Sequence, residues 1–382
     1  MSSSEDISER LAVAGMLVIL ILAAFLRLWG IGFGLPYANH PDESRFVMTS
    51  VKIIQTGDFN PGWFLQPTLY AYLSAGVLMI YFLLGVSQGV FTSVQDLFCP
   101  DYHFWGKIAY PGEFLVPRLL TALLGILSIW IIYELGRRVF NRRVGLLAAL
   151  LTALSYHHVS SSHFITTDVP ATFFALVTVI YSWLVWQEGR TRWYILAGLF
   201  AGLTASTRYN AGLVVFPLLV AHLFRWFDHK VYALSAPFVA GVLACVAGFL
   251  VGTPYALFDL PNFLDGLAYE VGHHLNVGHI GAEGNAGWWF FQHLVTGSER
   301  WLTAVGILGS LALAKRDWRR MLFLLCFPVS YYVMMSRSLV RFERFLVPLI
   351  PFLALSAALF LDQVCLLYTS DAADEEDSVD LG

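Results

Sequence analysis

Two adjacent carboxylates, Asp42 and Glu43, follow the first long apolar segment of the sequence, in the stretch YANHPDESRF. A carboxylate at this position could take a proton from a substrate hydroxyl group. The pair could also simply begin a helix, because Pro41 suits a first helical position and acidic residues complement the dipole of a first turn. A third acid, Asp168 in FITTDVPATFF, is either a site residue or the N-cap of a helix that Pro170 continues.

Several arginines could bind an anionic group, because a guanidinium group pairs bidentately with phosphate oxygens. Arg208 lies in ASTRYNAG, and Arg341 and Arg344 lie in SRSLVRFERFLVPLIP. Simpler interpretations stay open: Arg208 could contact lipid phosphates from a short hairpin, and Arg344 could form a surface ion pair with Glu343. Arg118 opens an apolar segment, where it could bind phosphate or extend its charged end toward the membrane surface.

The stretch YEVGHHLNVGHIGAEGNAGWWFFQHL carries imidazole and indole side chains. His273, His274 and His279 could bind a metal ion together with a carboxylate, because imidazole suits zinc and manganese. The histidines have no fixed ligand spacing, so the metal residues stay unknown, and a divalent cation such as Mg²⁺ or Mn²⁺ is one open alternative. Trp288 and Trp289, with His273 and His274, could contact an acceptor or a sugar, because aromatic rings pack on the apolar faces of sugars.

The composition of the chain places it in a membrane. Of its 382 residues, 57% are hydrophobic and 13% are charged, whereas soluble domains carry roughly 25% charged residues. The net charge of −4 comes without a basic stripe, which argues against a nucleic-acid partner. The four cysteines are scattered without CxxC spacing, so they predict neither a zinc site nor a disulfide framework.

Hydropathy and basic loops together predict the topology. We expect residues 1–10 and the basic loops GRRVFNRR, EGRTR, FRWFDHK and KRDWRR on the cytoplasmic side. Strict alternation between these loops then places Asp42, Asp168, Arg208 and Arg344 on the outer side. The predicted spans are 11–33, 115–136, 144–163, 169–187, 193–207, 210–226, 232–253, 301–314, 320–335 and 346–362.

One apolar segment, residues 68–87, does not fit the alternation. If it spanned the bilayer, every later basic loop would lie outside, against the positive-inside preference. We therefore expect it to lie in the outer leaflet, within a long outer loop formed by residues 34–114. A second outer loop covers residues 254–300.

The last residues, CLLYTSDAADEEDSVDLG, resemble the translation of a sequencing adaptor. Their alternative interpretation is an acidic disordered tail. We exclude residues 365–382 from the fold, which leaves residues 11–364 as the predicted membrane domain.

The order and sidedness of these motifs resemble a known family. An Asp-Glu pair after the first span, a second acid at the start of the fourth, the hairpin STRYNAG and the outer RFERFLVPLIP are similar to the phospholipid-carrier-dependent glycosyltransferases of the GT-C fold. Protein O-mannosyltransferases and lipid A aminoarabinose transferases belong to this group. The resemblance extends over nearly all of residues 11–362. It implies an all-α polytopic membrane protein, with juxtamembrane helices in a long first outer loop.

The resemblance also implies a reaction. A sugar would pass from a dolichyl or undecaprenyl phosphate donor to an acceptor hydroxyl at the outer face of the plasma membrane, with inversion. Asp42 would be the general base, with Glu43 orienting the site or helping to hold a metal ion. Arg208 and Arg344 would neutralise the leaving phosphate. The acceptor would be a protein, a lipid or a glycan.

Other features leave alternatives open. Where the family often carries an acidic or His-Pro-Pro motif, this chain has FLQPTLY with Gln66 and a single Pro67, so we expect no metal ligand there. A secondary transporter would also be polytopic, although it should show ionisable residues near the middle of the membrane and repeated halves. A lipid-handling membrane protein would not require Asp42.

Overall fold

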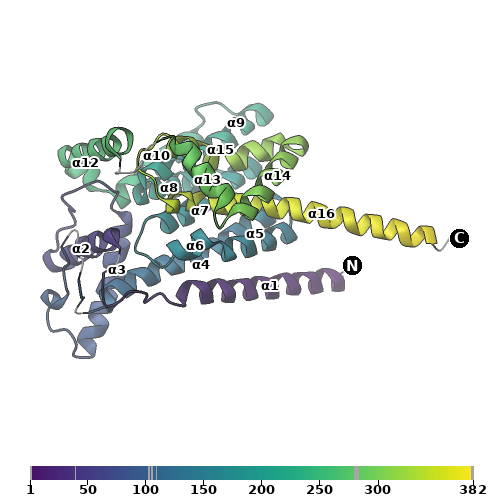
Figure 1. Ribbon diagram of the computed structural model, residues 1–382. Coiled ribbons are helices and arrows are strands. Elements are labelled where there is room, and N and C mark those ends of the chain that lie inside the picture. Colours follow the sequence, from purple (N-terminus) through teal and green to yellow (C-terminus); the bar gives the residue numbers. More distant parts are fainter. Residues whose placement is uncertain are drawn as a thin grey trace.

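The computed structural model describes residues 2–38, 40–101, 104, 106–108, 110–278 and 284–379, with side chains for those between residues 9 and 365. The described chain is a bundle of helices (Figure 1). Its long helices are α1 (Ser2–Leu28), α4 (Gly112–Val139), α5 (Arg142–Leu154), α7 (Asp168–Glu188), α8 (Thr191–Thr207), α9 (Val215–His229), α10 (Ala236–Gly252), α14 (Arg300–Arg316), α15 (Trp318–Met335) and α16 (Ile350–Val379).

Shorter or peripheral elements connect these helices. They are α2 (Pro41–Thr56), α3 (Leu69–Ser87), α6 (Tyr156–Ser161), α11 (Tyr255–Phe258), α12 (Leu260–Gly272), α13 (Ala286–Thr296), the 3₁₀ segments η1 (Val94–Asp96), η2 (Tyr209–Val214) and η4 (Glu343–Leu349), and the π-helical turn η3 (His273–Val277).

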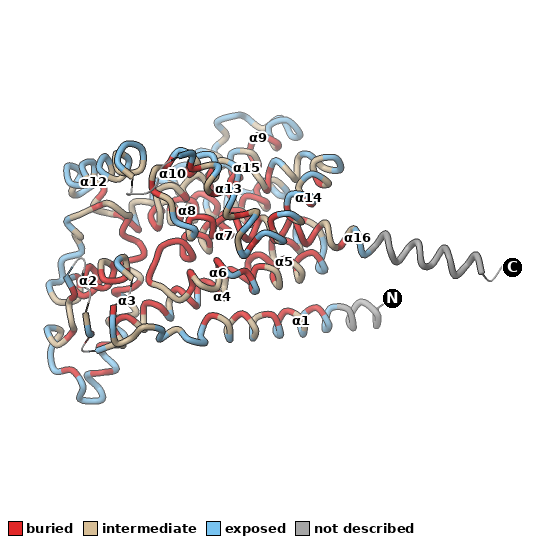
Figure 2. Tube along the Cα trace, viewed as in Figure 1, coloured by how far each residue is buried: buried red, intermediate tan, exposed pale blue. Residues whose placement is uncertain are grey.

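Six segments of the described chain are long and apolar enough to cross a membrane. They are Glu9–Leu28, Leu69–Ser87, Gly112–Val139, Asp168–Glu188, Tyr209–His229 and Glu343–Cys365. The large core lies between the long helices, and Figure 2 shows buried residues along α4, α7 and the start of α16. Much of α1 is exposed, and its apolar exposed side chains, such as Leu17 and Ile21, suit a lipid environment. The chain is therefore an integral membrane protein.

A second, smaller core joins α2 and α3 to the start of α4, through buried residues such as Phe46, Tyr70 and Phe114. These helices lie at the end of the bundle opposite the two termini (Figure 1). This position agrees with the juxtamembrane place expected for residues 68–87. Because α3 is also long and apolar enough to span, its non-spanning state stays a prediction. The artificial origin of residues 365–382 also stays a prediction.

The predicted span 144–163 is interrupted in the structure. α5 ends at Leu154, and Ser155 begins α6 by accepting a hydrogen bond from the backbone of His158. The guanidinium group of Arg27 on α1 donates hydrogen bonds to the carbonyl groups of Thr152 and Ala153, at the end of α5. A cation at a helix C-terminus satisfies the last carbonyls and favours termination there. Hydropathy alone does not show this break.

Candidate active site

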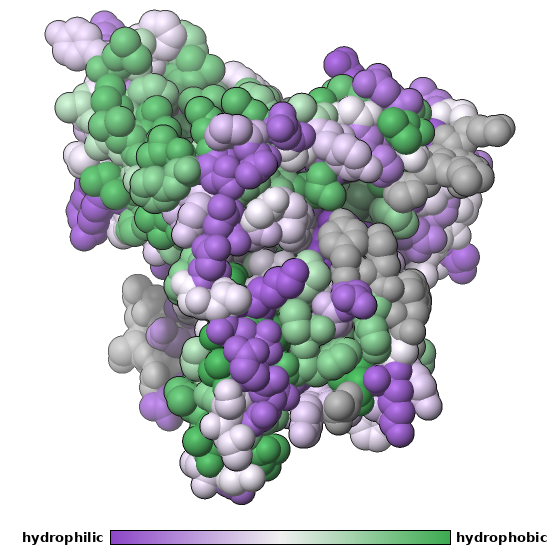
Figure 3. All heavy atoms as spheres, turned by 90° about the vertical axis from the view of Figure 1, so that its left-hand side faces the viewer, coloured by the Kyte–Doolittle hydropathy of each residue, from purple (hydrophilic) through white to green (hydrophobic). Residues whose placement is uncertain are grey.

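A pocket of about 950 Å³ opens among segments that are far apart in the sequence. Its walls come from the start of α2, the chain before α7, the α8–η2 turn, α12 with η3, and the segment from Ser338 to Phe345. At the end of the molecule that carries α2 and α12, hydrophilic residues form a band between hydrophobic areas (Figure 3). The volume suits a small ligand or a lipid head group.

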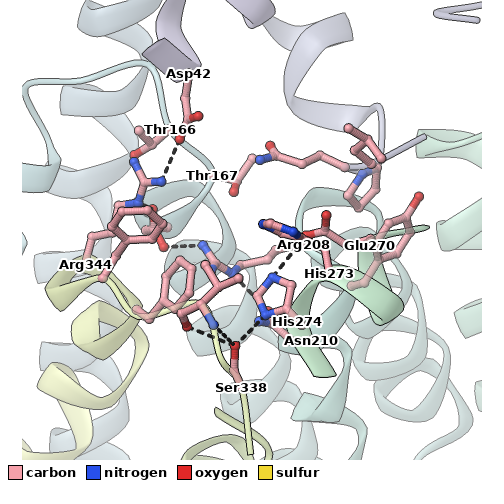
Figure 4. A pocket seen from close by; sticks show the side chains of 18 of the residues that line it. Asp42, Thr166, Thr167, Arg208, Asn210, Glu270, His273, His274, Ser338 and Arg344 are labelled. Carbon is pink, nitrogen blue, oxygen red and sulfur yellow. Dashed lines mark hydrogen bonds and ion pairs between the residues drawn. The ribbon is translucent and has the colours of Figure 1, made fainter. Parts of the chain in front are cut away.

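Asp42 lies in the first turn of α2, where His40 caps the helix and Pro41 begins it. The first-turn interpretation of this stretch is therefore correct, and it does not exclude a site role, because Asp42 lines the pocket. Its carboxylate lies 2.6 Å from Nη2 of Arg344, and Figure 4 shows the two side chains facing each other. Burial would raise the pKa of Asp42, but the charges of Arg344, His40 and Arg45 hold that pKa below its usual value.

Asp168 begins α7 and is almost fully buried. Its Oδ1 forms an ion pair with Nη1 of Arg208, and its Oδ2 lies 3.8 Å from Nε of Arg344. Arg344 therefore lies between the two carboxylates, Asp42 and Asp168. Arg208 is further held by Oδ1 of Asn210 at 2.9 Å and packs over the ring of Phe345. The four residues predicted from separate motifs meet in one cluster.

Glu43 does not line the pocket. Its fully buried carboxylate accepts two hydrogen bonds of 2.7 Å from Nε and Nη2 of Arg118. Arg118 also donates to the carbonyl groups of Ile31 and Phe33, and Glu43 accepts the backbone N–H of Ile165 at 3.0 Å. This clamp joins α2 and α4 to the segment that follows α1 and to the segment that precedes α7. It explains how Asp42 and Asp168 are held near each other.

The other predicted residues lie inside the pocket lining, outside it, or outside the described residues. His273 and His274 line the pocket; Nε2 of His274 lies 3.2 Å from Glu270, and its Nδ1 lies 2.7 Å from the hydroxyl of Ser338. Trp288 and Trp289 belong to α13, outside the pocket lining. Arg341 also lies outside it and donates a hydrogen bond to the carbonyl of Gly284. His279 is outside the described residues.

The acids of the pocket lie beside arginines and, among the described residues, belong to no metal-binding group. In the part of the chain that is described, no three His, Cys, Asp or Glu side chains are placed to hold a metal ion. Asp42 and Asp168 face the guanidinium groups of Arg344 and Arg208.

Several lining residues are not obvious from the sequence. His40 lies directly beside the cluster, with Nε2 2.9 Å from Nη1 of Arg344, and its place before Pro41 is the only signal. Arg45 lies one turn after Asp42 on α2, and Glu270 comes from α12. Thr166 stands just before Asp168. Only the fold brings these residues to one cavity.

Comparison with known proteins gives a consistent result. The family model of dolichyl-phosphate-mannose-protein mannosyltransferases matches residues 109–252. No curated protein sequence matches the chain.

Solved structures resemble the chain over most of its length. ArnT from Cupriavidus metallidurans, bound to undecaprenyl phosphate, is 19% identical, with a TM-score of 0.62 over 92% of this chain and 59% of that protein. The Archaeoglobus fulgidus oligosaccharyltransferase, solved with Zn and sulfate, is 16% identical, with a TM-score of 0.60 over 92% of this chain and 49% of that protein.

The oligosaccharyltransferase AglB from Archaeoglobus fulgidus, with an inhibitory peptide and a dolichol phosphate, is 13% identical, with a TM-score of 0.59 over 96% of this chain and 52% of that protein. The chain thus covers less than two thirds of each of these longer proteins. Together with the helical architecture described above, these matches confirm the predicted fold class: the chain has the all-α transmembrane fold of the GT-C glycosyltransferases.

Proposed function

We propose that this protein transfers a sugar from a polyprenyl phosphate donor to an acceptor hydroxyl group at the outer face of the plasma membrane. The observation that carries the proposal is the cluster of Asp42, Asp168, Arg208 and Arg344 in one pocket of about 950 Å³. Similarity to the dolichyl-phosphate-mannose-protein mannosyltransferase model supports a lipid-phosphate donor. So does the undecaprenyl phosphate bound by ArnT.

Arg208 and Arg344 are the groups that would bind the donor phosphate. Each guanidinium group carries five N–H donors in a fixed planar arrangement, so it can hold a carboxylate and a phosphate at the same time. Without a donor, Asp42 and Asp168 neutralise these cations. When the phosphate binds, it would take a share of the hydrogen bonds and gain charge as the sugar leaves.

Asp42 would act as the general base. The acceptor oxygen attacks the anomeric carbon, the bond from that carbon to the phosphate oxygen breaks, and the polyprenyl phosphate leaves with the bonding electrons. The proton of the acceptor hydroxyl passes to Asp42, and one displacement inverts the anomeric centre. Because a bound phosphate would draw Arg344 away from Asp42, the pKa of Asp42 would rise toward its ordinary value, which makes the carboxylate a better base.

The remaining residues would support this step. Asp168 would orient Arg208 and Arg344. The ion pair of Glu43 and Arg118 would keep Asp42 and Asp168 close together, because Glu43 also binds the backbone of Ile165 near Asp168. His273 and His274 line the wall across the pocket from α2 and are the acceptor or sugar contacts that stay in the proposal. Trp288, Trp289 and Arg341 have no part in it, because they do not line the pocket.

The test is transfer by the purified protein from synthetic polyprenyl phosphate sugars, with Asp42→Asn as the main variant. Asn keeps the size of Asp42 but removes the base, so the rate should fall by about two to four powers of ten. The donor KM should change little. Asp265→Asn is the matched control, because Asp265 is exposed on α12 outside the pocket, and it should leave transfer unchanged.

Mass spectrometry of lipids that purify with the protein gives an independent readout. A bound polyprenyl phosphate would support the proposal. Equal transfer rates for the wild type and Asp42→Asn would remove the base role from Asp42. If the wild type transferred no sugar from any polyprenyl phosphate donor and carried no such lipid, the proposed function itself would be wrong.

A further inference from the structure

Two uncharged side chains of the pocket carry oxygen atoms that have no hydrogen-bond partner among the described residues. They are Thr166, through Oγ1, and Gln66, through Oε1. Thr166 is only 4% exposed, so bulk water does not satisfy its hydroxyl group. A buried polar group without a partner costs roughly 1–3 kcal/mol, and such groups call for a specific explanation. A ligand in the pocket is one that fits their position.

The carboxylates of the same pocket differ, because each already has a partner. Asp42 and Asp168 pair with arginines, as described above, and Glu270 pairs with His274 at 3.2 Å. The fourth, Glu343, lies 3.5 Å from Nε2 of His293 and 3.9 Å from Nδ1 of His157. The oxygen atoms of Thr166 and Gln66 are therefore available to form hydrogen bonds with a neutral ligand that carries several hydroxyl groups.

The backbone fixes Thr166 firmly. The N–H group of Thr166 donates to the carbonyl of Phe164 at 3.0 Å, and the preceding residue, Ile165, donates to the buried carboxylate of Glu43. Figure 4 shows Thr166 beside Asp42 and Arg344. A group bound by Thr166 would thus lie next to the base and the phosphate ligand of the proposed reaction.

Gln66 approaches from a different segment, the chain between α2 and α3. Two residues later, the hydroxyl of Thr68 donates to the carbonyl of Gly252 at 2.6 Å, which anchors this segment to the end of α10. Gln66 and Thr166 therefore reach the pocket from two separately fixed parts of the structure. Preorganised polar groups of this kind lose little entropy when a ligand binds.

We propose that Thr166 and Gln66 bind the hydroxyl groups of the transferred sugar, an inference that rests on the function proposed above. A sugar hydroxyl both donates and accepts hydrogen bonds, as does Thr166, and the amide of Gln66 can present either its oxygen or its nitrogen. The two side chains carry no charge. They therefore suit a neutral sugar with free ring hydroxyls rather than one with a carboxylate or an ammonium group at these positions.

The experiment combines protein variants with modified donors. Thr166→Val keeps the shape of the side chain and removes its hydroxyl, and Gln66→Met keeps its length and removes the amide. Each variant is assayed with an undecaprenyl phosphate hexose that the wild type accepts, and with analogues of this donor that each lack one ring hydroxyl. With the complete sugar, we expect kcat/KM to fall about 3- to 10-fold for each variant, the range for one hydrogen bond between neutral groups.

The decisive result is the coupling between variant and analogue. For the analogue that lacks the hydroxyl bound by Thr166, Thr166→Val should be no worse than the wild type, because neither partner is left unpaired. Thr172→Val is the matched control: its hydroxyl is buried and donates to the carbonyl of Asp168 at 2.7 Å, but Thr172 does not line the pocket. Its effect should be the same for every donor.

Two outcomes separate this inference from the proposed function. If the wild type transfers sugar but both variants lose the same factor with all donors, Thr166 and Gln66 are structural and the inference is wrong. A larger loss with an amino sugar or a uronic acid donor than with the neutral sugar would also contradict it. If the wild type transfers no sugar at all, the proposed function is wrong, and the inference about Thr166 and Gln66 falls with it. Normal elution of each variant from a size-exclusion column shows that the variant is folded.

Discussion

The shared position of Arg344 between Asp42 and Asp168 makes this residue a test of phosphate binding. Arg344→Ala removes a charged hydrogen-bond donor, typically worth about 1.5–3 kcal/mol, so the donor KM should rise roughly 10- to 100-fold. The loss also removes the cation that lowers the pKa of Asp42. The acid limb of the pH–rate profile should therefore move to higher pH.

A matched control is Arg319→Ala. Arg319 also pairs with a carboxylate, Asp228, at 2.8 Å, but it lies away from the pocket. Steady-state kinetics over a pH series would give both quantities for the two variants. An unchanged donor KM in Arg344→Ala would assign the phosphate to other residues, and a similar rise in Arg319→Ala would indicate a general loss of stability.

His40 gives the site a pH dependence of its own. Burial lowers the pKa of His40 below its ordinary value of 6.5, and Arg344 lowers it further, while Asp42, Glu43 and Asp168 oppose the shift. The folded state therefore binds the proton of His40 less tightly than the unfolded state does. Stability should be fully present above pH 6.5 and should fall as the pH drops below that value toward the folded pKa.

Thermal unfolding of the purified protein between pH 8 and pH 5 measures this effect. His40→Asn keeps a side chain that can accept a hydrogen bond at the start of α2 and does not titrate, so its unfolding temperature should depend less on pH than that of the wild type. Identical pH dependence in the two proteins would show that His40 does not contribute to acid sensitivity.

At the scale of helices, α8 and α10 pack unusually closely through glycines. A Cβ atom at Gly202 would lie 2.1 Å from the carbonyl oxygen of Cys245, and one at Gly198 would lie 1.9 Å from that of Gly241. Small residues allow helix backbones in membranes to approach in this way. This contact also fixes the end of α8, where Arg208 follows.

Gly202→Ala should therefore destabilise the protein, because backbone atoms of α10 would have to move. Gly76→Ala on α3 is the matched control, since a Cβ atom there meets nothing within 4 Å. Both changes gain the same intrinsic helix propensity, about 1 kcal/mol, so the difference in unfolding temperature isolates the packing effect. Equal stabilisation of both variants would mean that α8 and α10 can separate without loss.

Sequence patterns predicted the positions of the helices better than the contacts between them. Apolar length and basic loops located most of the long helices, because bilayer thickness and positive-inside preference act on local composition. The break at Ser155 was missed because it depends on Arg27, which comes from another helix. The clamp between Glu43 and Arg118 was missed for the same reason, since its partners lie 75 residues apart.

The candidate site was predicted in part. Four charged residues stand at the ends of apolar segments: Asp42, Asp168, Arg208 and Arg344. A charged side chain next to a membrane span is costly to bury, so each of them marks a candidate functional residue. Their motifs were therefore visible. Thr166 was not predicted, and Gln66 was noted only for its place in FLQPTLY, because uncharged polar residues near helix ends are common and only an observed lack of hydrogen bonds distinguishes them.

At the scale of the whole molecule, the basic segment between α4 and α5 lies beside α1 near Glu9 and beside α16 near Asp362. Arg142, the first residue of α5, lies 3.7 Å from Glu9 on α1, and Asn141, which caps α5, donates a hydrogen bond of 3.0 Å to Asp362 on α16. The pocket lies at the opposite end, with α2 and α12 (Figure 1). If the basic end is cytoplasmic, the pocket opens at the outer face, whereas a spanning α3 would invert the later loops.

Cysteine labelling distinguishes these two topologies. Gln88 follows α3 and Arg143 lies in the first turn of α5, and both are exposed. Asn141 and Ser93 are less suitable positions, because each caps a helix. In a variant in which the four native cysteines are replaced by alanine, Gln88→Cys should react with an impermeant thiol reagent added to intact cells. Arg143→Cys should react only after the membrane is permeabilised.

The labelling pattern decides the site as well as the topology. If Arg143→Cys reacted in intact cells and Gln88→Cys did not, α3 would cross the membrane. The start of α2 and the start of α7 would then lie on opposite faces of the bilayer, which is incompatible with a pocket that Asp42 and Asp168 share through Arg344. That result would overturn the proposed site. Outer labelling of Gln88→Cys alone leaves Asp42, Asp168 and both arginines on the face where the proposed acceptor is reached.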